Sequence, residues 1–157
     1  MMGEMAVDRV ELMYRGVHGR LWRALLSFTG DAEMASDAES EAFAQVLRRG
    51  AAIDDVAAWV WRSSFQIARG MLADRSYRPP AKMHSTAGTA IDPSVAEFLS
   101  MLHGLSPQQR ACVVLRYVGG FTAPEIARLL DTTANTVRVQ LGSSTPLTTG
   151  QSQGEPT

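Results

Sequence analysis

A stretch rich in helix-breaking residues divides the chain and limits the folds that it can adopt. Residues 76–94, SYRPPAKMHSTAGTAIDPS, contain three prolines among Ser, Thr, Gly and Ala and show no hydrophobic periodicity. This composition is typical of a flexible linker. The blocks on either side carry apolar residues at helical spacing, without strand-like alternation. We therefore predict an all-α protein of two small helical domains joined by a flexible linker, rather than a single bundle.

Three amphipathic helices are predicted before the linker. The first ends near residue 29, the second covers residues 32–49, and the third covers residues 54–75 with Asp54 as its N-cap. The residues expected to face inward are Met13, Val17, Leu21, Leu25 and Phe28 in the first helix, Ala35, Ala38, Ala42 and Val46 in the second, and Val56, Val60, Ile67 and Met71 in the third.

The block after the linker is predicted to end in a helix-turn-helix. A helix capped by Ser106 stops at Gly119-Gly120, and a short helix over residues 123–130 follows. A tight turn at residues 131–133 requires a left-handed or bridge conformation, which Asp131 tolerates better than most residues. The second helix then exposes Asn135, Thr136, Arg138, Val139 and Gln140. Asn and Gln can read adenine and Arg can read guanine, although a packed hairpin with a polar surface fits the same pattern.

The charge of the chain argues against tight binding of nucleic acid by this protein alone. The net charge is −1, and no Lys or Arg follows Arg138. Phosphate neutralisation supplies most non-specific affinity for DNA, so any DNA contact must come from local placement of a few groups. The polar residues 145–157 are expected to form a disordered tail.

Several classes of protein are excluded by what the sequence lacks. No apolar run reaches the ~20 residues that span a bilayer, and the N-terminus does not resemble a signal peptide, so we expect a cytoplasmic protein without membrane insertion. Cys112 is the only cysteine, and the three histidines lack metal-ligand spacing. No nucleophile elbow or phosphate-binding glycine loop is present. We therefore expect no enzyme activity, no catalytic residue, no metal and no cofactor.

Two segments resemble one family in the same order along the chain. LSPQQRACVVLRYVGGFTAPEIARLLDTTANTVRVQL, residues 105–141, resembles region four of bacterial extracytoplasmic-function (ECF) sigma factors of the sigma-70 family, and FTGDAEMASDAESEAF with AWVWRSSFQIARGMLADR resembles their region two. The matching positions in region four are Leu105, Pro107, Arg110, Leu115-Arg116-Tyr117, Glu125-Ile126-Ala127 and Thr136-Val137-Arg138. The resemblance implies a region-two domain at residues 1–75 and a region-four domain at residues 95–144.

The third helix of the first block is the expected site for the melted minus-10 strand. Trp59 and Trp61 lie about 200° apart on a helix, so both cannot face one core, and one should be partly exposed. Unpaired bases stack on aromatic rings that are flanked by cations, although packing of one Trp on a neighbouring helix would also fit. The resemblance implies minus-10 contacts by Trp59, Trp61, Arg62, Ser63, Gln66 and Arg69.

An acidic run lies on the second helix. A solvated helix face is the ordinary interpretation of Asp31, Glu33, Asp37, Glu39 and Glu41. In the family this helix binds the clamp of the largest polymerase subunit, and the resemblance implies polymerase contacts by Asp37, Glu41 and Phe43.

The expected minus-35 contacts lie in and before the last helix. Thr122, at the N-terminus of the short helix, is expected to bind a backbone phosphate together with free amides. The complete set is Thr122, Thr133, Asn135, Thr136, Arg138, Val139 and Gln140.

The sequence therefore predicts a sigma factor that binds core RNA polymerase and promoter DNA, with an anti-sigma factor as a common partner in the family. Two alternatives remain open. One is a sigma-like regulator or degenerate paralogue that does not initiate transcription, which Ser40 (where the family usually has Gln) and the short reading helix would favour. The other is a helical interaction protein without DNA binding, whose acidic helix is the working surface.

Overall fold

The structure is a computed structural model that describes residues 2–74 and 93–142. These residues form α-helices and one 3-10 turn, with no strand among them, as the sequence predicts. The chain divides into two compact units, residues 1–88 and 89–157. Most of the expected linker and all of the expected tail lie outside the described residues, and the second unit begins its first helix at Pro93.

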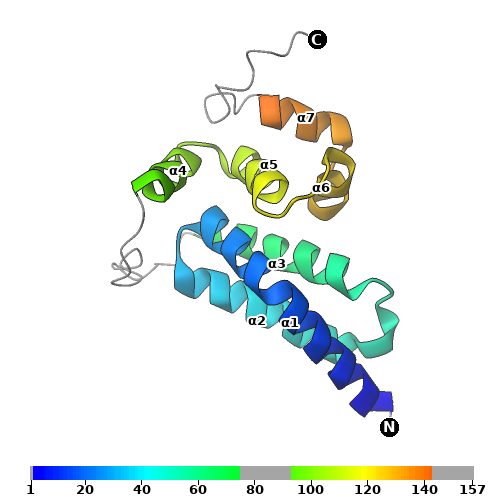
Figure 1. Ribbon diagram of the computed structural model, residues 1–157. Helices are drawn as coiled ribbons and strands as arrows, with labels where there is room; N and C mark the ends of the chain where they lie inside the picture. The colour runs from blue at the N-terminus through cyan, green and yellow to red at the C-terminus, as the bar shows by residue number, and fades with distance from the viewer. Residues whose placement is uncertain (1, 75–92, 143–157) are drawn as a thin grey trace. The chain divides into compact units, whose positions relative to one another are not determined.

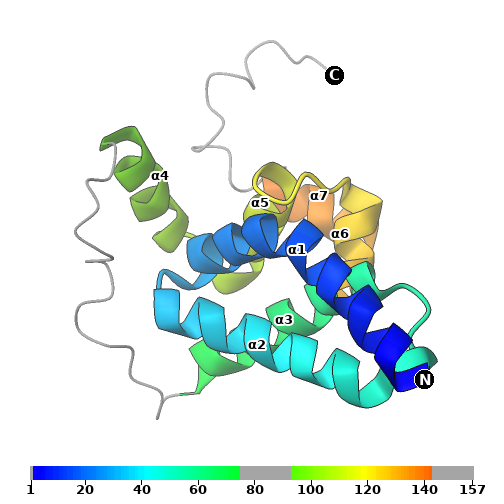
Figure 2. The ribbon, with the colours of Figure 1, turned by 60° about the horizontal axis from the view of Figure 1, so that its bottom comes forward.

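The first unit is a three-helix bundle. It contains α1 (Met2–Thr29), α2 (Ala32–Arg49), the 3-10 turn η1 (Gly50–Ala52) and α3 (Val56–Ala73). Each of the three α-helices packs against the other two, and Figure 1 and Figure 2 both show α1 beside α2. The predicted inner residues of α2 are all buried. The core therefore lies between three amphipathic faces.

The inner face of α3 differs from the one predicted. Val60 is buried as expected, but Val56, Ile67 and Met71 are only half-buried. The buried side chains of α3 include Phe65, whose ring centroid lies 5.2 Å from that of Phe28 on α1. The prediction followed the aliphatic residues, whereas the larger aromatic side chain fills the space between the helices.

Aspartates begin both α2 and α3. The Asp31 carboxylate accepts hydrogen bonds from the backbone N–H groups of Glu33 and Met34, and it is 2% exposed. At α3 the N-cap is Asp55, which accepts from the Ala58 N–H, so the prediction of Asp54 is wrong by one residue. Each cap satisfies backbone donors that the helix itself leaves unpaired.

The second unit contains α4 (Pro93–His103), α5 (Pro107–Tyr117), α6 (Ala123–Leu130) and α7 (Ala134–Gly142). Ser106 and Gln109 form a reciprocal capping box at the start of α5. The chain leaves α5 through Gly119, where a Cβ atom would lie 2.8 Å from the Leu115 carbonyl oxygen, so only glycine fits there. Cys112 is buried.

The turn between α6 and α7 has the left-handed residue that the sequence predicts. Asp131 has φ 58° and ψ 53°, and its N–H bonds to the Ala127 carbonyl. This conformation costs roughly 1–2 kcal/mol for a residue with an ordinary Cβ, and glycine avoids that cost.

We expect Asp131→Gly to leave the melting temperature unchanged or raised and Asp131→Val to lower it, as measured by far-ultraviolet circular dichroism. Equal melting temperatures for the two variants would contradict this account of the turn.

Candidate functional site

The α6–turn–α7 unit is held by a small apolar contact. Ile126, Ala127 and Leu130 on α6 and Val137 on α7 are buried. The Thr133 hydroxyl caps α7 by accepting from the Thr136 N–H at 3.1 Å. The two threonine hydroxyl oxygens also lie 2.8 Å apart and share a hydrogen bond. Both hydroxyls therefore fix the start of α7.

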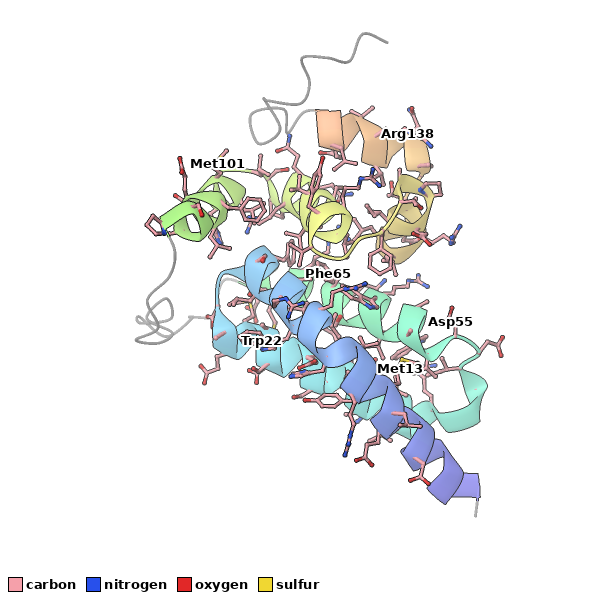
Figure 3. The ribbon with its side chains drawn as sticks, viewed as in Figure 1. Met13, Trp22, Asp55, Phe65, Met101 and Arg138 are labelled. Carbon is pink, nitrogen blue, oxygen red and sulfur yellow. The ribbon has the colours of Figure 1, made fainter. Side chains whose placement is uncertain are left out.

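Fewer side chains are exposed on the outer side of α7 than the sequence indicates. Asn135, Arg138 and Val139 are exposed, whereas Thr136 and Gln140 are half-buried. The three exposed residues stand at positions i, i+3 and i+4, so they share one face of the helix. Figure 3 shows the Arg138 side chain projecting from α7. A carboxamide, a guanidinium and an apolar side chain are thus presented together.

The start of α6 carries a carboxylate where the sequence predicts free amides. The Glu125 side chain accepts from the Thr122 N–H at 2.9 Å, and the Thr122 hydroxyl accepts from the Glu125 N–H. The hydrogen bond from the Thr122 backbone lowers the pKa of Glu125. Pro124 has no N–H. Two of the amides expected to be free at this helix end are therefore engaged in the capping box, so a phosphate would compete with the Glu125 carboxylate for the Thr122 N–H.

The described part of the second unit carries few cations. Residues 93–142 contain four arginines and no lysine, against three acidic residues. Arg110 is buried, and Arg116 donates to the Phe121 carbonyl oxygen at 3.2 Å. Arg128 on α6 and Arg138 on α7 are exposed. Sequence reasoning missed Arg128, although its position on the first helix of the predicted helix-turn-helix pointed to it.

The two tryptophans of α3 have different surroundings, as helical geometry predicts. Trp61 is 5% exposed, and its ring stacks with that of Phe65 at a centroid distance of 6.3 Å. Trp59 is half-buried, and the guanidinium carbon of Arg49 lies 5.4 Å from its ring centroid. The cation beside the accessible ring therefore comes from the end of α2, which sequence reasoning missed.

The remaining predicted minus-10 residues also differ in how far their side chains are exposed. Arg62 and Gln66 are exposed, Arg69 is half-buried, and Ser63 is 8% exposed. Direct contact of DNA with Trp61 or Ser63 is not available in this conformation, because the packing of the described residues covers both side chains. Of the predicted set, Trp59, Arg62, Gln66 and Arg69 therefore have accessible side chains, and Arg49 lies beside Trp59.

The acidic run on α2 divides into buried and exposed residues. Asp31 is the buried N-cap, and Glu39 is 4% exposed, with its carboxylate 2.6 Å from Nδ1 of His18. Glu33, Asp37 and Glu41 are exposed. The interpretation of the whole run as one solvated face is therefore wrong.

The predicted polymerase contacts also differ in exposure. Asp37 and Glu41 lie on the surface, and hydrogen bonds from Gln45 and Arg48 lower the pKa of Glu41. Phe43 is 7% exposed and packs edge-on against Tyr14 at 5.0 Å between centroids. A direct contact by Phe43 is therefore unavailable in this conformation, while Tyr14, which covers it, is 39% exposed.

The buried Glu39 gives the first unit a distinct dependence on pH. Desolvation raises the pKa of Glu39 above its ordinary 4.5, and the hydrogen bond to His18 opposes this only in part. The folded state therefore keeps its proton to a higher pH than the unfolded state does. We expect the contribution of Glu39 to stability to fall as pH rises from about the unfolded pKa through the raised folded pKa.

Tryptophan fluorescence can measure this effect, since Trp22, Trp59 and Trp61 all lie in the first unit. Urea unfolding at several pH values should show a weaker fall of stability with pH in Glu39→Gln than in the unchanged protein. Glu41→Gln is the control, because the lowered pKa of Glu41 gives a contribution of the opposite sign. An identical pH profile for Glu39→Gln and the unchanged protein would contradict this assignment.

The described residues contain neither a metal-binding cluster nor a membrane-spanning helix. Among them, no group of three or more His, Cys, Asp or Glu side chains is placed to hold a metal ion. None of the described helices has the length and apolar character needed to cross a membrane.

A family profile and a curated relative are similar to parts of this chain. The profile of the family described as "Sigma-70, region 4" matches residues 96–142. The ECF RNA polymerase sigma factor BldN of Streptomyces coelicolor is 26% identical over 142 residues, which cover 78% of this chain. The alignment spans only 52% of the length of BldN.

A solved structure shares the fold. It is the sigma factor RpoE from Bartonella quintana, crystallised in complex with the anti-sigma factor NepR. The TM-score is 0.67 at 13% sequence identity, and the match covers 93% of this chain and 98% of that one. The likeness extends to both helical units.

Proposed function

We propose that this chain is a sigma factor of the ECF type within the sigma-70 family, and that it binds core RNA polymerase and directs it to promoters. It performs no chemistry itself and acts by positioning the polymerase and promoter DNA. The observation that carries the proposal is the single exposed face of α7, on which Asn135, Arg138 and Val139 stand together beyond a capped turn.

In this proposal α7 lies in the major groove of the minus-35 element. A recognition helix contacts bases through residues near its N-terminus, while the preceding helix crosses the DNA backbone. Asn135 suits an adenine edge, and Arg138 suits O6 and N7 of a guanine. Arg128 on α6 is exposed on the helix that would cross the backbone, where its guanidinium can bind a phosphate. Thr133 and Thr136 support the reading face by fixing the start of α7.

The first unit is proposed to capture the melted minus-10 strand through Trp59. Its ring is partly accessible and has the Arg49 guanidinium over it, so a base can stack against an aromatic and a cation together. Arg62, Gln66 and Arg69 lie on the same helix and are at least partly accessible. Trp61 has a structural role beneath this surface.

The exposed acids of α2 are proposed to bind the polymerase. Asp37 and Glu41 are one helical turn apart, so they form one acidic edge that complements a basic surface. Phe43 supports this helix from within, and Tyr14 is the aromatic side chain that reaches the surface beside it. An anti-sigma factor that covers the first or second unit would compete with polymerase or promoter.

The small number of cations fits a protein that binds DNA mainly as part of a holoenzyme. Each phosphate contact contributes a slope of about −0.9 in log affinity against log salt. Two exposed arginines on α6 and α7 supply little of this electrostatic affinity. Weak binding by the free chain would keep it from occupying promoters without polymerase.

The test is a DNA-binding assay with and without purified core enzyme over a range of salt concentrations. A labelled pool with a randomised minus-35 segment should yield selected sequences only when chain and core are both present. Selection by the chain alone would favour a sigma-like regulator. Absence of a chain–core complex, together with absence of DNA binding, would favour a helical interaction protein.

A further inference from the structure

Val139 is an apolar side chain that lies largely exposed on the outer face of α7. It is 56% exposed, whereas Val137, about 200° away around the helix, is fully buried and anchors α7 to its neighbours. A β-branched residue also forms helix less readily than the long polar residues that usually occupy such positions. The exposed side chain of Val139 is therefore accessible to a binding partner.

The neighbours of Val139 indicate what it meets. It follows Arg138 in sequence and lies one helical turn after Asn135, and these are the exposed polar residues of the same face. If Arg138 and Asn135 approach base edges, Val139 is carried into the groove with them. The apolar feature in the major groove of DNA is the C5-methyl group of thymine.

We propose that Val139 determines specificity by packing against the methyl group of a thymine beside the base pair that Arg138 reads. This inference rests on the proposed function and adds a base preference to it. The minus-35 element would then contain an adenine for Asn135, a guanine for Arg138 and a thymine for Val139 within the few base pairs that α7 spans. The methyl contact carries no charge, so it adds discrimination to a surface that is poor in cations.

The experiment uses the full chain bound to core polymerase and a minus-35 sequence selected from a randomised pool. Each selected thymine is replaced in turn by deoxyuridine, which removes only the methyl group. We expect one position to lose about fourfold in affinity, the effect of one buried methyl-sized group. Other thymines should show no change.

The variant Val139→Ala identifies the protein partner of that methyl group. It should bind the thymine and uracil sites equally while keeping the guanine preference of Arg138, and Val139→Ile should retain the thymine preference. Because Val139 is exposed, circular dichroism should show that all three proteins are folded, with the same melting temperature or a slightly higher one for Val139→Ala, since alanine favours helix. Selective binding without any deoxyuridine effect, or a thymine preference that persists in Val139→Ala, would overturn the assignment. A holoenzyme that selects no sequence would overturn the proposed function as well.

Discussion

Replacing Trp61 by alanine is expected to destabilise the first unit by about 3–5 kcal/mol, the usual cost of removing a buried aromatic side chain. Trp61 is 5% exposed and stacks with Phe65, so its removal leaves a cavity beside α3. Urea unfolding can be followed by the fluorescence of Trp22 and Trp59, which remain. Because the fold itself weakens, promoter binding and promoter opening should decline together in this variant.

Trp59→Ala is the matched comparison, and it is expected to fail in a different way. Trp59 is half-buried under Arg49, so its loss should change stability much less than loss of Trp61. Stacking of one base on an aromatic ring is worth about 1–3 kcal/mol, so opening should fall by roughly 5–150-fold with little change in closed-complex formation. Trp59→Phe keeps an aromatic face and should restore most of the loss.

Permanganate reactivity of unpaired thymines measures opening, and a gel shift with duplex promoter measures closed-complex formation. Selective loss of opening in Trp61→Ala at unchanged stability would contradict the structural role of Trp61. Equal loss of both steps in Trp59→Ala would remove Trp59 from strand capture. Arg49→Gln should reproduce part of the Trp59→Ala defect if the guanidinium supports the stacked base.

Arg138→Ala is expected to remove about 1–3 kcal/mol of discrimination at one guanine of the minus-35 element. The exposed guanidinium can bond two acceptors of guanine at once, and no other exposed cation lies on the described part of α7. Affinity of the holoenzyme for the selected site should fall, while affinity for a site with that guanine replaced should stay nearly unchanged. Competition binding with four probes that differ at this one position measures the effect.

Arg128→Ala provides the control for Arg138. Arg128 is exposed on α6 and is proposed to bind a phosphate. Its loss should therefore weaken binding to all four probes alike, and it should reduce the slope of log affinity against log salt by the share of about one phosphate contact. A preserved guanine preference in Arg138→Ala would exclude Arg138 from base reading. A changed base preference in Arg128→Ala would indicate that α6, too, lies in the groove.

Local chemistry explains what the sequence predicts well. Features that depend on a few adjacent residues can be predicted without the tertiary structure. These are the left-handed conformation of Asp131, the helix caps of Ser106 and Thr133, and the end of α5 at Gly119-Gly120. The capping box of Thr122 and Glu125 was also readable, because Thr-x-x-Glu before an apolar run is its signature.

Tertiary packing explains what sequence reasoning could not predict. Helical spacing shows that Trp59 and Trp61 differ, but only the packing of α3 shows which of them is buried. The burial of Glu39 against His18 depends on how α1 packs along α2, because the two residues are 21 positions apart in the sequence. The pairing of Arg49 with Trp59 likewise depends on the path of the chain through η1. These contacts decide which of the predicted polymerase and minus-10 residues are accessible.

Runoff transcription with purified core enzyme tests the central proposal most directly. The templates should carry the minus-35 sequences selected by chain and core together. These sequences should be placed at a range of distances from a minus-10 segment whose two strands separate. We expect discrete transcripts that require both the chain and the selected sequence, and that are reduced but not abolished by Arg138→Ala. Transcripts that do not depend on the chain, or a chain that forms no complex with core enzyme, would contradict it.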